Sequence, residues 1–331
     1  MPAGIFYCIG SLKSKFSVEN VLPKLLDWSE QGLDVCLATL YHAESTSPRP
    51  VGSQMAVAQN GEWFGYLSGG CAEQAIADEA VACINAQQNR TIRYGVGSPY
   101  LDIKLPCGAG IDVCFDQSLS DTIIRKTIKQ HEQRQVVGLE MSFEKNSQSQ
   151  LVKSDSLENL NSSTFRRWYM PQRRLLIIGA GPSVAALAAL AIQADYELQV
   201  FTPDQQTLDE VRQYTQSAEL LESKAQIQSL ECDAFTAVVL MFHEHERETE
   251  ILQFFLSTDV YYIGALGSRL TQKIRLDNLR QQGVSESALS RVHGPVGLAI
   301  QARTPAEIAL SVLAELTLEY QKSAPKVLEF N

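Results

Sequence analysis

The sequence predicts an α/β protein of two domains, an N-terminal α+β domain over residues 1–163 and a C-terminal domain over residues 164–331. The C-terminal domain is expected to hold a parallel sheet with helices on both faces, because buried strand-like runs alternate with helical segments from Arg174 onward. A chain of 331 residues also exceeds what one hydrophobic core usually organises. We place the boundary after segment 143–163, which is rich in Ser, Asn, Gln and Lys, as linkers and exposed hairpins are.

The composition excludes several classes of protein. Hydrophobic residues make up 45% of the chain and charged residues 20%, which is typical of a folded globular protein. The formal net charge of -10 opposes binding to nucleic acid. No apolar run is long enough to span a bilayer, and residues 1–10 lack the features of a secretory signal. We therefore expect a cytoplasmic protein with neither a nucleic-acid nor a membrane partner.

The seven cysteines include no CxxC pair. An odd number without that spacing predicts neither a disulfide framework nor a zinc ribbon. Most of these cysteines are expected to be buried, reduced thiols.

The N-terminal half contains patterns of both helices and strands. Residues 17–31 place apolar side chains on one side of a helix, and residues 71–87 predict a second helix. Residues 53–59 and 62–67 flank Asn60-Gly61, which predicts a β-hairpin. The other expected elements are strands at 34–42, 111–115 and 136–141 and a polar helix at 121–133.

The C-terminal half begins with a predicted βαβ unit, formed by residues 175–178, 183–193 and 197–201. The turn Gly179-Ala180-Gly181-Pro182 joins its first strand to its helix. Such a turn directs backbone amides at a phosphate above the helix, which indicates a Rossmann-like domain. Gly179, Gly181 and Pro182 are therefore candidate residues for binding NAD(P) or another nucleotide. Val184 replaces the usual third glycine, although Ala185 next to it is small enough for close packing of the helix. Because fold and function separate easily, a Rossmann scaffold that has lost its dinucleotide is an equal alternative.

The end of the second strand bears on the same question. NAD-binding domains usually carry an acidic residue where this chain has Thr202. Asp204 follows two residues later and leaves two alternatives, a contact with the ribose or a cap on the next helix. We favour the cap.

Further candidates follow two more buried strands, at 236–241 and 260–264. Ligands of Rossmann domains bind at this edge of the sheet. His243 is either a site residue or an ordinary loop residue, and the histidines here do not predict a metal site. The loop after the second of these strands contributes Gly267, Ser268 and Arg269, of which Arg269 is expected to face phosphate.

Two loops of the N-terminal half combine small residues with reactive groups. The loop 45–53 is rich in Ser, Pro and Gly and carries one cation, Arg49, as anion-binding loops often do. The loop Ser68-Gly69-Gly70-Cys71 leads into a helix, whose unpaired amides and dipole would favour a thiolate at Cys71. Cys71 is therefore either a reactive thiol or a small buried residue at a helix start.

A second cysteine repeats this pattern, because Cys107 lies beside Gly108 and Gly110 ahead of a strand. Soft metals prefer thiolate ligands. Two glycine-flanked cysteines together with Arg49 indicate a surface for an anionic ligand that favours sulfur.

The motifs resemble those of the XdhC/CoxI family, accessory factors of xanthine dehydrogenase and related molybdenum hydroxylases. The resemblance covers nearly the whole chain. In the N-terminal half it rests on segments 47–55, 65–73 and 107–108. In the C-terminal half it rests on segments 179–182, 243–244, 262–269, 294–298 and 304–309.

This resemblance implies an accessory protein rather than a metabolic enzyme. It implies a chaperone that binds the molybdenum cofactor, molybdopterin, transiently while a cysteine desulfurase provides its sulfido ligand, and then delivers it to apo xanthine dehydrogenase or a related molybdoenzyme. Cys71 matches the cysteine associated with cofactor binding, Cys107 matches the second cysteine motif, and Arg49 is placed to pair with the cofactor phosphate. Homodimer formation stays open, and the alternative function is an NAD(P)- or nucleotide-dependent oxidoreductase.

Overall fold

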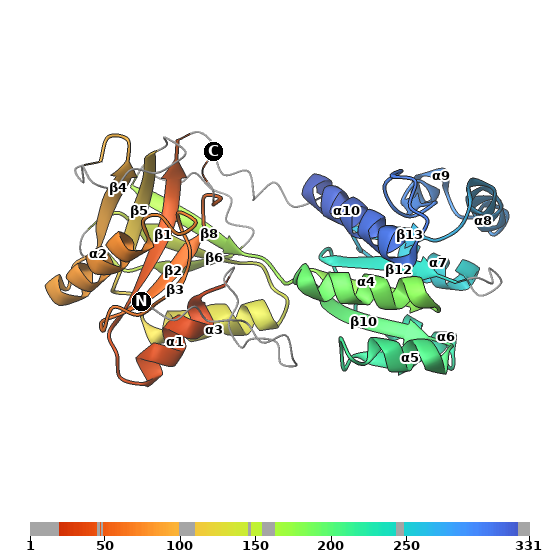
Figure 1. Cartoon of the computed structure of the whole chain (residues 1–331), viewed down its shortest axis with the longest axis horizontal. Helices are drawn as coiled ribbons and strands as arrows, with labels where there is room; N and C mark the ends of the chain where they lie inside the picture. The colour runs from red at the N-terminus through yellow and green to blue at the C-terminus, as the bar shows by residue number, and fades with distance from the viewer. Residues whose placement is uncertain are drawn as a thin grey trace. The chain divides into compact units, whose positions relative to one another are not determined.

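The protein is described by a computed structural model of residues 20–44, 47, 49–98, 110–144, 147–153, 163–242 and 248–323 (Figure 1). The chain divides into two compact units, one ending at Pro171 and the other starting at Gln172. Among the described ranges, no helix combines the length and the apolar character needed to cross a membrane.

The first unit is built on a five-stranded antiparallel sheet with strand order β3-β2-β1-β5-β4. Its strands are β1 (Val35–Ala43), β2 (Gln54–Ala58), β3 (Trp63–Gly65), β4 (Arg90–Gly95) and β5 (Gly110–Asp116). The predicted hairpin at Asn60-Gly61 is confirmed, because β2 and β3 pair with Met55 opposite Gly65.

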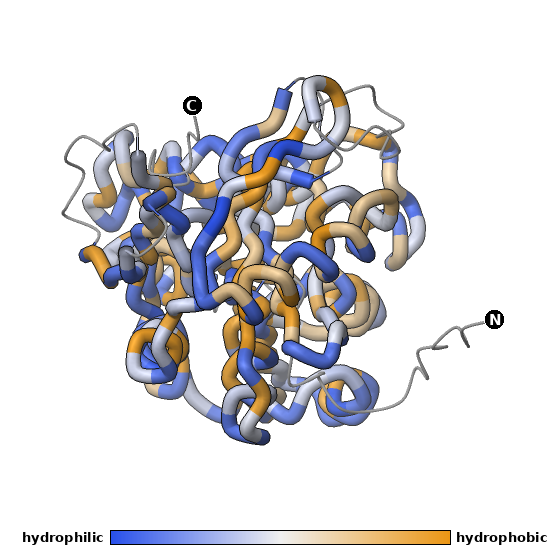
Figure 2. Tube along the Cα trace, turned by 90° about the vertical axis from the view of Figure 1, so that its left-hand side faces the viewer, coloured by the Kyte–Doolittle hydropathy of each residue, from blue (hydrophilic) through white to orange (hydrophobic). Residues whose placement is uncertain are grey.

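Helices and a second small sheet cover the two faces of this sheet. Helix α2 (Glu73–Ala86) packs on one face, where Ile76 and Ala80 join a core with Leu40. The other face packs against α1 (Leu22–Glu30), α3 (Asp121–Glu132) and the antiparallel strands β6 (Val137–Ser142), β7 (Gln150–Lys153) and β8 (Thr164–Tyr169). In Figure 2 the helices carry hydrophobic residues beside hydrophilic ones, as expected for one buried and one exposed side.

Strand β8 explains why the first unit extends beyond the boundary expected at residue 163. The strand pairs antiparallel with β6, placing Tyr169 opposite Val137, and Tyr169 is buried in the core. The segment before it includes β7, which pairs with β6, so part of the polar stretch forms a hairpin. The units therefore divide at Pro171 and Gln172.

The register of the five strands brings three connections to one edge of the sheet. Strand β1 ends at Ala43 and β2 begins at Gln54, beside the end of β3 at Gly65. At the same edge, Ala43 lies opposite Ile111 near the start of β5, and Gly110 lies opposite Gly95 at the end of β4. We call this side of the sheet the loop edge; it carries the described residues of the β1–β2 connection (44, 47 and 49–53), segment 66–72 and both ends of the β4–β5 connection.

The second unit contains a six-stranded parallel sheet with order β11-β10-β9-β12-β13-β14. Numbered within the unit, this is the order 3-2-1-4-5-6 of a Rossmann fold, which confirms the predicted class. The strands are β9 (Arg174–Gly179), β10 (Glu197–Thr202), β11 (Ala218–Leu220), β12 (Thr236–Met241), β13 (Tyr262–Ala265) and β14 (Val292–His293).

Helices cover both faces of this sheet, as predicted. Along β9, Leu175 and Ile177 face one core while Leu176 and Ile178 face the other. The first core includes side chains of α4 (Pro182–Gln193), α5 (Gln205–Val211) and α10 (Pro305–Ser323). The second core includes side chains of α6 (Lys224–Gln228), α7 (Glu248–Leu256), α8 (Arg269–Gln281) and α9 (Glu286–Leu289).

The close approach of β9 and β12 requires glycine at position 179. A Cβ atom added there would lie 2.3 Å from the carbonyl oxygen of Met241. We expect Gly179→Ala to lower the free energy of unfolding by more than about 2 kcal/mol in urea denaturation. The matched control is Gly283→Ala, where φ is +83° and no atom lies within 4 Å of the added Cβ, so only about 1 kcal/mol should be lost. Equal losses in the two variants would contradict this account.

Candidate functional site

A buried carboxylate organises the turn that precedes α2. Glu73 is 4% exposed, and its side chain accepts hydrogen bonds from the amides of Leu67 (3.1 Å), Ser68 (2.8 Å), Gly70 (2.8 Å) and Ala72 (3.2 Å). The Ser68 hydroxyl also donates to Glu73 at 2.6 Å. One acidic side chain thereby fixes the whole turn.

These bonds alter the expectation that unpaired amides of the turn favour a thiolate at Cys71. The Ser68 hydroxyl oxygen accepts from the amides of Cys71 (3.1 Å) and Ala72 (2.8 Å), so the amides expected to favour a Cys71 thiolate already have acceptors. Burial raises the pKa of Glu73, but hydrogen bonds from Ser68 and from backbone amides outweigh it and hold the pKa below the usual value. A negative charge supplied by the chain itself therefore occupies the turn.

Cys71 differs from the other described cysteines of the first unit in its surroundings. Its free thiol is exposed, and Gly69 and Gly70 beside it are exposed as well. The alternative of a small buried residue at a helix start is therefore wrong for Cys71. By contrast, burial raises the pKa of Cys83 to about 11 and that of Cys114 to about 12.

Arg49 belongs to the neighbouring connection of the loop edge. Its side chain is half-buried, and its amide donates to the Ser47 hydroxyl at 3.4 Å. The amide of Gly52 bonds the Leu40 carbonyl at 2.7 Å, which returns the segment to β1. The sheet thus carries Arg49 and Cys71 on loops of the same edge, whereas Cys107 lies outside the described residues.

In the second unit, the glycine turn has few amides left for a phosphate. The Ala180 amide donates to the Met241 carbonyl at 3.2 Å, and the Gly181 amide donates to the Thr207 hydroxyl at 2.9 Å. Pro182, at the start of α4, has no N–H. The amide of Val184 bonds the Gly181 carbonyl at 3.0 Å.

Asp204 supports this closed arrangement. Its Oδ2 atom accepts from the Thr207 amide (2.8 Å) and from the Thr207 hydroxyl (2.6 Å), which makes it the N-cap of α5. Hydrogen bonds from Thr207 lower the pKa of Asp204. The structure thus shows the cap that we favoured, and Thr202 is fully buried.

The remaining candidate binding residues of this unit do not come together in a site within the part of the chain that the structure describes. Ser268 caps α8 by accepting the Thr271 amide at 3.1 Å, Gly267 precedes it, and Arg269 is exposed. His243 lies outside the described residues. Within the described ranges, no group of three or more His, Cys, Asp or Glu side chains is arranged to hold a metal ion.

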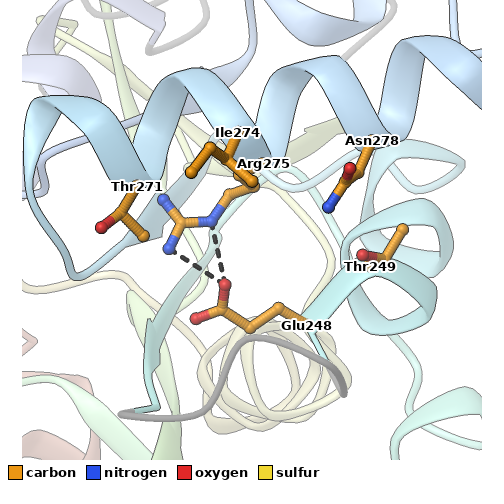
Figure 3. A pocket seen from close by; sticks show the side chains of 6 residues that line it. All are labelled: Glu248, Thr249, Thr271, Ile274, Arg275 and Asn278. Atoms are coloured by element: carbon orange, nitrogen blue, oxygen red, sulfur yellow. Dashed lines mark hydrogen bonds and ion pairs between the residues drawn. The ribbon is translucent and has the colours of Figure 1, made fainter.

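A buried ion pair of the second unit, close to the end of β13, was not predicted from the sequence. Arg275 on α8 donates from Nε to Glu248 on α7 at 3.0 Å, and its other nitrogens bond Gln272 (2.6 Å) and the Leu266 carbonyl (2.8 Å). The pair lines a pocket of about 70 Å³ with Thr249, Thr271, Ile274 and Asn278 (Figure 3). Its bonds hold α7, α8 and the loop after β13 together. No local sequence pattern marks this pair, because its partners lie on different helices.

Comparisons with known proteins agree with this architecture. The model of the XdhC Rossmann domain matches residues 175–316, and that of the XdhC and CoxI family matches residues 28–95. A crystal structure described as a xanthine dehydrogenase from Bacillus halodurans superposes with a TM-score of 0.75, covering 93% of this chain and 98% of that chain at 22% identity. At that identity, the likeness shows the fold.

Two curated relatives are similar over most of their length. The molybdenum cofactor insertion chaperone PaoD of Escherichia coli is 34% identical over 303 residues, which covers 91% of this chain and 86% of the relative. A probable xanthine dehydrogenase subunit of Bacillus subtilis is 26% identical over 328 residues, with coverage of 90% and 96%. On the strength of these matches, the chain belongs to the XdhC and CoxI family.

Proposed function

We propose that this protein is a cytoplasmic accessory factor that binds the molybdenum cofactor at the loop edge and delivers it to xanthine dehydrogenase or a related molybdenum hydroxylase. The observation that carries the proposal is the exposed thiol of Cys71, held on a rigid turn beside the loop of Arg49. Family membership and the similarity to PaoD support an accessory role.

The chemistry of the loop edge matches the two ends of such a ligand. A cysteine sulfur is a soft donor of the kind that binds transition metals, so Cys71 is proposed as a ligand for molybdenum. A guanidinium pairs well with phosphate, so Arg49 is proposed to bind the cofactor phosphate. The bonds of Glu73 and Ser68 hold the turn without the ligand, which reduces the entropy lost on binding.

The proposal includes two partner proteins. A cysteine desulfurase would provide the sulfido ligand while the cofactor is bound here, and an apo molybdoenzyme would then receive it. Cys71 needs access to solvent for both exchanges, and its exposed position provides that access.

The oxidoreductase alternative has less support. A dinucleotide bound in the usual way needs free amides at the glycine turn and a close approach at the third glycine position. Here the Gly181 amide bonds Thr207, Pro182 has no amide hydrogen, and Val184 is fully buried in the core. These residues do not fit a pyrophosphate at this turn, so we propose no hydride transfer.

Removing the thiol should abolish most cofactor binding. We expect Cys71→Ala to retain less than about a tenth of the molybdenum and pterin that copurify with the wild type under mild anaerobic conditions, because a metal ligand is lost. The measurement is elemental analysis of molybdenum together with fluorescence of the oxidised pterin. Cys232→Ala is the matched control, since Cys232 is a partly exposed thiol of the second unit. Equal cofactor content in all three proteins would overturn the role of Cys71.

The carboxylate of Glu73 should contribute a pH-dependent stability. Its pKa is lowered in the folded protein, so this stabilisation is fully present above the usual value of 4.5 and is lost as the pH falls through the folded pKa. At pH 7 we expect Glu73→Gln to lower the free energy of unfolding by about 1–3 kcal/mol. The difference from the wild type should shrink in acid.

Urea denaturation at a series of pH values tests this expectation. Asp78→Asn is the control, because Asp78 is an exposed carboxylate of the same helix, and its effect should stay within about 0.5 kcal/mol. A Glu73→Gln deficit that is the same at every pH would show that the charge is not responsible.

Because the amides of the glycine turn are bonded within the protein or missing, the turn should not bind dinucleotides or ATP. We expect isothermal titration of the full chain with NAD, NADP and ATP to give no binding heat, and thermal unfolding to show no stabilisation by these ligands. Micromolar affinity for any of them would contradict our description of the turn and would revive the oxidoreductase alternative.

A further inference from the structure

The loop edge carries a second group of polar side chains, distinct from Cys71 and Arg49. His42 at the end of β1 lies 2.7 Å from Asp112 on β5, measured from Nδ1 to Oδ2. The same Asp112 oxygen lies 2.9 Å from Arg93 on β4, and Arg93 also pairs with Glu44 just after β1. These four residues form a row across three neighbouring strands, which we call the histidine row.

The histidine row exists because β1 contains a bulge. The pairing of β1 with β5 shifts between Leu40 and His42, so Tyr41 is the extra residue. After the shift, His42 lies directly opposite Asp112, and Asp112 lies opposite Arg93 in the next pair of strands. Without the bulge, the alternation of a strand would turn His42 to the other face of the sheet.

Hydrogen-bond acceptors from three segments of the chain hold the guanidinium of Arg93 in place. Its Nε atom donates to the Val96 carbonyl at 2.8 Å, while its two terminal nitrogens contact Asp112 and Glu44. A Cβ at Gly110 would lie 2.4 Å from Arg93 Nη2 and 2.9 Å from the Val96 carbonyl oxygen, so a side chain there would displace the guanidinium from this position. The guanidinium therefore holds Asp112 in one position at the root of the β4–β5 connection.

Asp112 in turn fixes the imidazole of His42. A carboxylate accepts only, so Nδ1 carries the hydrogen and, in the neutral ring, Nε2 presents its lone pair. The His42 side chain is 53% exposed, and no described residue bonds Nε2. A contact between groups as exposed as these contributes little stability. A carboxylate that holds one ring nitrogen is, however, typical of histidines whose other nitrogen binds a metal or acts in catalysis.

We propose that His42 is a further binding residue of the loop edge and that Nε2 accepts a hydrogen bond from the pterin ring of the bound cofactor, with Asp112 and Arg93 as its positioning residues. This inference rests on the proposed function. The pterin edge offers N–H donors, which an unprotonated imidazole nitrogen accepts. A role for His42 as a metal ligand has less support, since the described residues include no set of side chains that could complete a metal site.

Affinity measurements on the full chain test the proposal. The probe is molybdenum cofactor released from a purified molybdoenzyme, and the bound fraction is found by anaerobic ultrafiltration with molybdenum analysis. We expect His42→Ala to weaken binding about tenfold, as the loss of one ligand hydrogen bond would. Asp112→Asn should weaken it about threefold, and the double variant should bind no more weakly than His42→Ala, because Asp112 acts through His42.

The controls separate this role from a structural one. His131→Gln changes a histidine on α3 and should keep wild-type affinity, and thermal unfolding of each variant checks that it is folded. Wild-type affinity in His42→Ala would overturn the proposal while leaving the role of Cys71 intact. Additive losses in the double variant would overturn the positioning role of Asp112. If the wild type itself binds no cofactor, the proposed function fails and this inference fails with it.

Discussion

Antiparallel pairing of β1 with both β2 and β5 is the constraint on which the candidate site depends. The register places the ends of β1, β3 and β4 beside the starts of β2 and β5, so residues far apart in the sequence share one edge. Arg49, Cys71 and His42 reach that edge on different segments, and none of them needs the second unit to be placed there. The sheet is the frame, and the residues that we propose for the site lie on its connecting loops or at the ends of its strands.

The two glycine turns of this protein are stabilised in the same way, with different consequences. In each turn, an acidic side chain of the protein takes part in bonding the backbone amides that precede a helix. In the first unit Glu73 accepts from these amides directly. In the second unit the Gly181 amide donates to the Thr207 hydroxyl, which in turn donates to Asp204. In the first unit this leaves a thiol exposed on an ordered turn. In the second it occupies an amide that a phosphate would need. For this reason we propose that the Rossmann unit keeps its fold without binding a pyrophosphate at this turn.

Much of this architecture could be predicted from local patterns, and the rest depends on long-range geometry. Asn60-Gly61 predicted the hairpin, the run Leu175 to Ile178 predicted a strand buried on both faces, and the cap by Asp204 follows from its position before a helix. The pairing of His42 with Asp112 needs a bulge and a strand register that span 70 residues, which periodicity does not reveal. The turn that carries the exposed Cys71 is held by the buried carboxylate of Glu73, and composition gives no sign of these bonds.

The central claim is that the cofactor binds at the loop edge through the sulfur of Cys71. X-ray absorption at the molybdenum edge, recorded on the full chain loaded with cofactor, tests it most directly because the spectrum counts the sulfur ligands of the metal. We expect the wild type to show one more sulfur ligand than the small fraction of cofactor that Cys71→Ala retains, with each spectrum scaled to its molybdenum content. Identical spectra for the two proteins would contradict the claim and would leave Cys71 without a place in the site.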